Sequence, residues 1–306
     1  MKDYWEYNDD TAGKVPKDVT HVVVKDGIEF IPERAFKNYT QLVSIQLPDS
    51  IKRIGHSAFA SCTSLSSIEI PPSIETITYY TFFGCTSLTS VKLRMPIRLT
   101  TIQGCAFQGC TSLTSIDFPP TLKNICYRSF SGCTSLKSWI VPRSIEYMEE
   151  TCLDDCTSLT SICLPYQEFV RYSINPTITK KFRFFQQTLF QFFIRLLRTC
   201  PEIANKPCTD NHVLPLHLML IIGCCCTECE DIVNASPQAL SIRDPIYHMY
   251  PFLLAACEKS SIINCRARSN FQKHNQLQQL ECVYLLLREA PFVIQYLLPN
   301  LIHQET

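Results

Sequence analysis

Glycine, net charge and long apolar runs are all scarce in this sequence of 306 residues. With eight glycines in the whole chain, no glycine-rich loop that could cradle a nucleotide phosphate is found. The 28 basic and 28 acidic side chains cancel, and charged residues make up 18 % of the chain against about 25 % in average domains. A general affinity for nucleic acids or other polyanions is therefore not expected.

Membrane and export signals are also missing from the sequence. The longest apolar stretch, VLPLHLMLIIGCCC, covers 14 residues and contains Pro215 and His217, so it is too short to cross about 30 Å of hydrocarbon. The first residues, MKDYWEYNDDTAGK, contain four acids and no apolar run, and no secretory signal is visible. We therefore expect no transmembrane segment, a cytoplasmic location and reduced thiols for the 18 cysteines.

Motifs that carry catalysis were sought and not found. The seven histidines are not accompanied by GxSxG, HExxH or a paired-carboxylate motif. We therefore expect no catalytic residues, no enzyme activity and no cofactor.

One local motif, CCCTEC at residues 224–229, has metal-like spacing. Cys226 and Cys229 form a CxxC pair, and Cys225 would share a helix face with Cys229. A second pair with CxxC or HxxxH spacing is missing, which favours a thiol cluster over a zinc site. A thiol-dependent or zinc-dependent function of this cluster is kept as an alternative.

Residues 1–165 contain an internal repeat. TSL recurs in CTSLSSIEI, CTSLTSVKL, CTSLTSIDF, CTSLKSWIV and CTSLTSICL, with a weaker copy in YTQLVSIQL. Successive leucines of this motif are 23, 23, 25, 23 and 23 residues apart, and the two extra residues lie between Arg94 and Leu99. A fixed period of this length is typical of a solenoid.

Each part of the repeat has a physical role. The alternation in LxSIxL predicts a strand whose inward residues, such as Leu65, Ile68 and Ile70, stack on a parallel sheet with about 4.8 Å between repeats. A proline ends the strand, and an apolar pair three residues apart then turns a second face inward. A large ring closes the core of each repeat. These rings are Phe36, Phe59, Phe82, Phe107 and Phe130, with Leu153 in the last copy.

A tight corner is expected where the repeat closes. The residue before the cysteine is mostly of a type that tolerates a left-handed backbone. These residues are Asn38, Ser61, Gly84, Gly109, Gly132 and Asp155. The cysteines form a column of five side chains that point the same way, so we interpret them as small buried groups rather than disulfides or redox centres. They are Cys62, Cys85, Cys110, Cys133 and Cys156.

The unit, as in IPPSIETITYYTFFGCTSLTSVKLR, resembles the BspA-type leucine-rich repeat, a 23-residue variant of the LxxLxL family that occurs in bacterial surface proteins and microbial eukaryotes. The resemblance covers residues 15–165 and implies a curved parallel-sheet solenoid that binds proteins and has no catalytic residues. Three positions depart from the pattern: Tyr39 replaces the cysteine, Leu153 replaces the phenylalanine, and Trp139 stands at an inward isoleucine position.

Residues 166–306 are expected to be helical. The pattern at 180–199 predicts an aromatic helix that covers the open end of the solenoid, and a helix lying on a membrane surface is the alternative. Beyond it, a fainter repeat of 36 residues relates Pro215 to Pro251. Pro215 is expected to open a helix, and His217 to brace a turn by a hydrogen bond rather than to bind a ligand.

The segment LPLHLML resembles the TPLHxA opening of ankyrin repeats, although Leu214 replaces the capping threonine. The predicted fold is therefore an α/β repeat solenoid: a leucine-rich-repeat parallel β-sheet over residues 1–165, followed by an all-α ankyrin-like stack of helical hairpins over 166–306.

We predict a non-enzymatic scaffold that binds a protein partner through the outward face of its strands. One outward column is uniformly serine and includes Ser67, Ser90 and Ser115. The other varies along the repeats: Gln46, Glu69, Lys92, Asp117 and Ile140. Two alternatives stay open, namely that serine simply tolerates a solvated strand and that the chain is an exported cell-surface adhesion protein.

Overall fold

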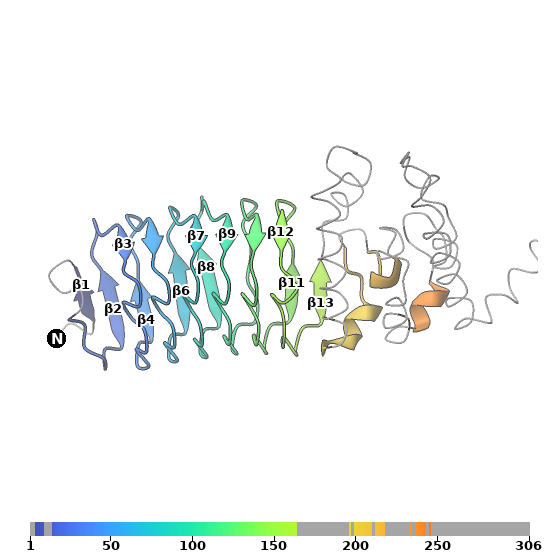
Figure 1. Ribbon diagram of the computed structural model, residues 1–306, viewed down its shortest axis with the longest axis horizontal. Coiled ribbons are helices and arrows are strands. Elements are labelled where there is room, and N and C mark those ends of the chain that lie inside the picture. Colours follow the sequence, from blue (N-terminus) through green and yellow to red (C-terminus); the bar gives the residue numbers. More distant parts are fainter. Residues whose placement is uncertain are drawn as a thin grey trace, which may run out of the picture. The chain divides into compact units, whose positions relative to one another are not determined.

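The computed structural model describes residues 4–8, 14–163, 196, 199–209, 212–217, 233, 237–242 and 245. The chain divides into two compact units, Met1–Thr160 and Ser161–Thr306. The first unit is a stack of coils, one for each repeat, and each coil contributes short parallel strands to two faces (Figure 1).

The first face consists of the strands that carry the LxSIxL pattern. Where neighbouring strands pair, they do so in parallel with a shift of one repeat, so that Ile68 lies opposite Val91 and Ser67 opposite Ser90. This pairing buries the alternate apolar side chains and confirms the predicted inward positions. The strands are β1 (Trp5–Tyr7), β2 (His21–Val24), β4 (Ser44–Gln46), β6 (Ser67–Ile70), β8 (Ser90–Leu93) and β11 (Ser138–Ile140), and the second unit begins with β13 (Ser161–Cys163).

The second face consists of strands of only two residues, whose second residue is buried. This confirms that the apolar pair after the proline turns inward. β3 pairs with β5, and the other four form one sheet in the order β12-β10-β9-β7. The bounds are β3 (Phe30–Ile31), β5 (Arg53–Ile54), β7 (Thr76–Ile77), β9 (Thr101–Ile102), β10 (Asn124–Ile125) and β12 (Tyr147–Met148).

The first face is not one continuous sheet. Residues 115–118 form no strand, although Ile116 is buried as predicted. Phe118 and Trp139 stand where other copies carry aliphatic side chains, and their rings pack edge to face at 4.8 Å between centroids. Because such rings need more room than the aliphatic side chains they replace, the two backbone segments do not stay close enough for strand pairing.

The core of the first unit is a ladder of phenylalanine rings. Consecutive rings from Phe36 to Phe130 lie 5.0–5.4 Å apart with interplanar angles of 5–15°. All five rings are fully buried. Tyr7 packs on the first ring at 5.4 Å, and Trp139 packs edge to face on the last at 4.9 Å. The predicted register of the rings is confirmed.

Two left-handed residues shape each coil that carries a core phenylalanine. The corner before the cysteine is left-handed at all six predicted positions, with φ between 59° and 74°. A second left-handed column, which no common residue type marks in the sequence, precedes each ring by two residues: Arg34, Ser57, Tyr80, Cys105 and Arg128. Four of them donate a backbone hydrogen bond to a backbone oxygen of the next coil, and Arg128 donates to a threonine hydroxyl there. These bonds offset the about 1–2 kcal/mol that a non-glycine residue loses in this conformation.

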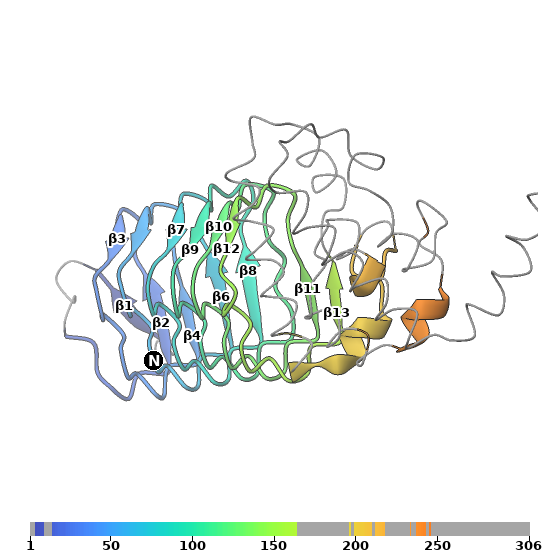
Figure 2. The same cartoon turned by 45° about the vertical axis from the view of Figure 1, so that its right-hand side comes forward.

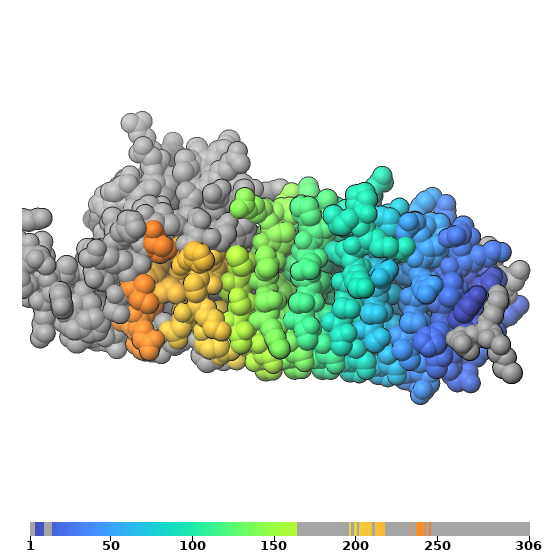
Figure 3. All heavy atoms as spheres, turned by 180° about the vertical axis from the view of Figure 1, so that it is seen from behind, coloured from blue at the N-terminus to red at the C-terminus, as the bar shows by residue number. Residues whose placement is uncertain are grey.

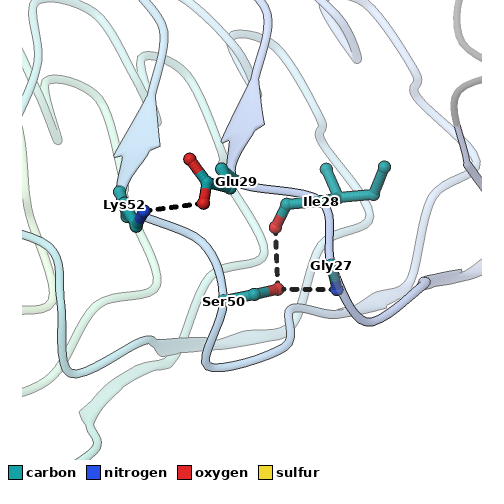
Figure 4. A network of polar contacts seen from close by, with 5 residues as sticks. All are labelled: Gly27, Ile28, Glu29, Ser50 and Lys52. Carbon is teal, nitrogen blue, oxygen red and sulfur yellow. Dashed lines mark hydrogen bonds and ion pairs between the residues drawn. The ribbon is translucent and has the colours of Figure 1, made fainter.

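Hydrogen bonds and an ion pair join the first two coils on the side of β3 and β5 (Figure 4). The Ser50 hydroxyl donates to the Ile28 carbonyl at 2.7 Å and accepts from the Gly27 amide at 3.2 Å. Beside it, Lys52 Nζ lies 2.6 Å from Glu29 Oε1. Thr121 and Ser144 donate to a carbonyl of the preceding coil in the same way, so this hydroxyl-to-carbonyl hydrogen bond recurs along the stack.

The expected all-α ankyrin-like stack is not supported in the second unit. Among its described residues, the helical ones are 196, 199, 215–217, 233 and the two short 3₁₀ helices η2 (Pro201–Asn205) and η3 (Pro237–Ser241). A 3₁₀ helix closes tighter turns with poorer hydrogen bonds than an α-helix, and it does not form the long helical pairs of an ankyrin repeat. Most of the predicted aromatic helix at 180–199 lies outside the described residues.

Two local predictions in the second unit are confirmed. Helical structure begins at Pro215. His217 is buried, and its Nε2 lies 2.8 Å from the Ile242 carbonyl, 25 residues along the chain. Because a carbonyl only accepts, Nε2 carries the proton, and His217 braces η3 from the start of a helix.

Candidate interaction surface

The outward residues of the first face are accessible, as the alternation requires. Gln46, Glu69, Lys92 and Asp117 are exposed, and Ile140 is 61 % exposed. In the serine column, Ser67 and Ser115 are exposed and Ser90 is half-buried. The structure therefore places all eight predicted residues on the outside, one band of side chains for each coil.

Charges in the variable column are partly neutralised within the protein. Glu69 and Lys92 lie opposite each other on β6 and β8, with 3.7 Å between Oε1 and Nζ. Both side chains are more than half exposed, so this ion pair contributes less than about 1 kcal/mol to stability. The pair instead sets the local charge pattern that a partner would meet.

The second face is neutralised in the same manner. Lys52 pairs with Glu29, and Lys123 pairs with Glu146 at 3.1 Å, in both cases between adjacent coils. Successive coils lie directly side by side along the stack (Figure 3), so one position of the repeat forms a continuous column. These ion pairs help to hold neighbouring coils in register, and their charges are already neutralised within the protein.

The segment from Arg94 to Leu99, which contains the insertion, is tied to a coil two repeats away. Arg94 Nη1 lies 2.7 Å from Asp49 Oδ1, and Nη2 donates to the Leu47 carbonyl, two coils back along the stack. The sequence pattern showed the insertion but not this contact, because no periodic position carries it. Arg94 therefore acts as a clamp at the copy whose length departs from the repeat.

The cysteine column consists of buried thiols that donate weak hydrogen bonds. Each Sγ lies 3.0–3.3 Å from the backbone oxygen of the core phenylalanine of the previous coil. Burial raises the pKa of the Cys62 thiol to about 12 and raises the pKa of Cys110 and Cys133 well above the ordinary value. Since the thiolate is the reactive form, these thiols are unsuited to redox or nucleophilic chemistry.

We expect the buried thiols to make the fold sensitive to alkali. A thiol in the unfolded chain ionises near pH 8.5, whereas the folded thiol stays protonated to about pH 12 at Cys62. Stability is therefore unaffected below about pH 8 and falls as the pH rises above the unfolded pKa, by up to about 1.4 kcal/mol per thiol and pH unit. Urea unfolding at pH 7, 9 and 10 measures the slope.

A Cys85→Ala variant serves as the comparison for this prediction. It has one buried thiol fewer, so its free energy of unfolding should fall less steeply between pH 9 and 10 even if it is lower throughout. An equal slope in the variant would show that other groups cause the alkaline loss.

Metal and membrane features are absent from the part of the chain that the structure describes. No group of three or more histidine, cysteine or acidic side chains is arranged to hold a metal ion there. All eleven cysteines in that part are free. No helix within it is long and apolar enough to cross a membrane. Cys226 and Cys229 lie outside the described residues, so the interpretation of CCCTEC stays a prediction.

The family comparison identifies the repeat. A profile of the BspA-type leucine-rich repeat region matches residues 16–98 and 91–185 in six copies. No curated protein matches the chain.

Several solved structures are similar to part of the chain. A leucine-rich repeat protein of T. pallidum is 29 % identical, with 50 % of this chain and 61 % of that chain covered and a TM-score of 0.35. One from Bacteroides ovatus is 24 % identical, with 49 % and 48 % covered and a TM-score of 0.37. A leucine-rich cell surface protein of Faecalibacterium prausnitzii is 22 % identical, with 49 % and 54 % covered and a TM-score of 0.33. The chain thus spans 48–61 % of the length of these proteins.

Proposed function

Because this chain belongs to the BspA-type leucine-rich repeat proteins, we propose that it is a non-enzymatic scaffold that binds a protein partner through the outward columns of the first face, on β4, β6, β8, residues 115–118 and β11. Family membership agrees with the resemblance seen in the repeat. The observation that carries the proposal is the separation of roles within each strand. Inward positions are apolar and buried except for the half-buried Leu93 and Phe118, whereas the outward positions from Gln46 to Ile140 are exposed and differ in charge and polarity from coil to coil.

The chemistry of the variable column suits recognition of a shaped, charged partner surface. It presents Gln46, the Glu69–Lys92 pair, Asp117 and then the apolar Ile140 along successive coils. Beside it the small serine side chains let a partner approach the strands closely. Complementary charges fix the register of such a contact and accelerate association.

We predict that reversing two charges of this column weakens partner binding. In the Lys92→Glu, Asp117→Lys variant the charge pattern is inverted while the net charge of the chain is unchanged. We expect the affinity for a partner isolated with the wild-type chain to fall by about tenfold or more, because like charges then face each other across the interface. The dissociation constant of the full-length proteins is the measurement.

Lys52→Glu, Glu29→Lys is the matched control for this test. It inverts an ion pair on the second face of the first two coils and leaves the first face unchanged. Binding should be retained in this variant. Full binding by the Lys92→Glu, Asp117→Lys variant would move the contact away from the column.

The compartment remains a prediction. The cytoplasmic location expected above is not supported by the comparisons, and the family resemblance includes surface proteins. Free cysteines throughout the described residues favour a reducing compartment. A fractionation assay of the tagged full-length chain distinguishes the two, because the adhesion alternative requires the protein outside the cell.

The thiol or zinc alternative depends on the CCCTEC cluster, in which Cys226 and Cys229 are the candidate ligands. Elemental analysis of the purified chain tests it directly. One equivalent of zinc that is lost in a Cys226→Ala, Cys229→Ala variant would replace the scaffold interpretation of that segment.

A further inference from the structure

Exposed aromatic side chains gather at one corner of the coils. Tyr79, Tyr80, Phe83 and Tyr127 are 37–42 % exposed, in the loops that follow β7 and β10. Because the strands of this face are parallel, these loops lie at the same edge of the stack (Figure 2). With His56 from the loop after β5, they form what we call the aromatic patch.

The rings of the aromatic patch touch one another across coils. Tyr79 lies 5.7 Å from His56 and 6.2 Å from Tyr127 between ring centroids, with interplanar angles of 35° and 36°. Tyr80 and Phe83 meet edge to face at 5.8 Å beside this row. The result is a ridge of aromatic rings across four coils rather than scattered exposed rings.

A glycine allows rings from non-adjacent coils to meet. Gly104 occupies the position of Tyr79 and Tyr127 in the coil between them. A Cβ at Gly104 would lie 2.4 Å from Tyr127 Cε1, so the Tyr127 ring rests over the glycine. The patch therefore depends on this residue as well as on its aromatic members.

The fold does not need these rings for its core. The phenylalanine ladder is fully buried without them, and ion pairs outside the patch already join adjacent coils on both strand faces. Within the patch there is no carboxylate, and the exposed Arg128 next to Tyr127 has no ion pair within the described part of the chain. Tyrosine and arginine are the residues that most often dominate protein interfaces.

We propose that the aromatic patch binds an extended, proline-containing peptide segment of a partner protein, with an acidic residue of that segment on Arg128. A polyproline II segment has no internal hydrogen bonds, so its carbonyls need donors, and its proline rings pack on aromatic rings. The patch supplies both, with tyrosine rings in a row and the exposed Arg128 next to Tyr127 in the chain. One turn of such a segment is about 9 Å long, which the row from His56 to Tyr127 accommodates.

A sugar chain is the alternative occupant of the patch, and the experiment distinguishes it from a peptide. The inference rests on the proposed function only in that the chain binds proteins, and it adds a second surface that is separate from the strand columns.

Selection from a random peptide library on the full-length chain tests the proposal. We expect enriched peptides to contain prolines three residues apart and a neighbouring aspartate or glutamate. A labelled synthetic peptide of this kind should bind the Tyr79→Ala, Tyr127→Ala variant at least tenfold more weakly than the wild type. Phe30→Ala is the matched control, because Phe30 is an aromatic residue that is 61 % exposed outside the patch.

A second comparison addresses the acidic residue. Replacing the aspartate of the peptide by asparagine should weaken binding to the wild type but not to Arg128→Ala, since only the wild type carries the cation. The proposal is overturned by enrichment of peptides without proline, by failure to enrich any peptide, or by unchanged binding to the double tyrosine variant. Retention on a glycan array that the same variant loses would assign the patch to carbohydrate instead.

Failure here is distinguishable from failure of the proposed function. The peptide should bind the Lys92→Glu, Asp117→Lys variant as it binds the wild type, because that variant leaves the patch intact. A partner that needs the strand columns but no proline-containing segment would support the proposed function and overturn this inference.

Discussion

Replacing Phe82 by alanine is expected to lower the free energy of unfolding by about 3–5 kcal/mol. Phe82 is fully buried and lies between two stacked rings, Phe59 at 5.4 Å and Phe107 at 5.2 Å. Alanine leaves a cavity in the middle of the ladder that the neighbouring rings cannot fill, because backbone hydrogen bonds hold their coils at fixed spacing. Urea unfolding of the full-length chain measures the loss.

The adjacent residue provides the control. Phe83→Ala removes the same ring from a position that is 37 % exposed, so a change within about 0.5 kcal/mol is expected. The Phe82 variant should also unfold less cooperatively, because each coil of a solenoid is stabilised only by its neighbours and a weak central coil uncouples the two ends. Equal losses from the two substitutions would mean that the ladder is not the main source of stability.

Gly55→Ala is expected to be the most damaging single-methyl substitution in the described coils. A Cβ at this position would lie 2.5 Å from the Glu33 nitrogen and 2.8 Å from the Pro32 carbonyl carbon, both backbone atoms of the preceding coil. The backbone can avoid this overlap only if two coils move apart, which breaks the ladder between them. We expect a loss of about 3 kcal/mol or more, seen as a lower midpoint of thermal unfolding.

Gly104→Ala is the control for this prediction, because its added methyl group would overlap a side chain instead of backbone atoms. Its Cβ would come equally close to a neighbour, at 2.4 Å, but that neighbour is the ring of Tyr127, which is 42 % exposed and can rotate away. We expect a loss below about 1 kcal/mol. Similar losses in the two variants would show that the coils yield as readily as an exposed side chain.

Much of the first unit could be predicted from the repeat. The period places Phe59, Phe82 and Phe107 at equivalent positions, and equivalent positions in a parallel coil must lie above one another. The same logic located the left-handed corner, because five of its six positions carry glycine, asparagine or aspartate, which tolerate a left-handed backbone. The inward and outward sides of the strands followed from the alternation.

Contacts between unlike positions could not be predicted in this way. Whether Tyr127 would reach Tyr79 depends on the glycine in the coil between them, and whether Arg94 would reach Asp49 depends on the path of two inserted residues. The left-handed column at Arg34 and Tyr80 carries no compositional signal, since it is imposed by hydrogen bonds to the next coil. The interrupted sheet at residues 115–118 likewise reflects how two bulky rings share one space.

The two halves of the chain differ in how much local pattern can specify. A period repeated six times dictates the coil, its ring ladder, its thiol column and its exposed face, because each copy constrains the next. In the second half, apolar residues near prolines suggested paired helices, but the described parts contain mainly short 3₁₀ helices, since a weak pattern leaves the choice of helix to packing. Which side chains meet at the surface was settled by the stacking of the coils, and the aromatic patch exists only because that stacking brings distant residues together.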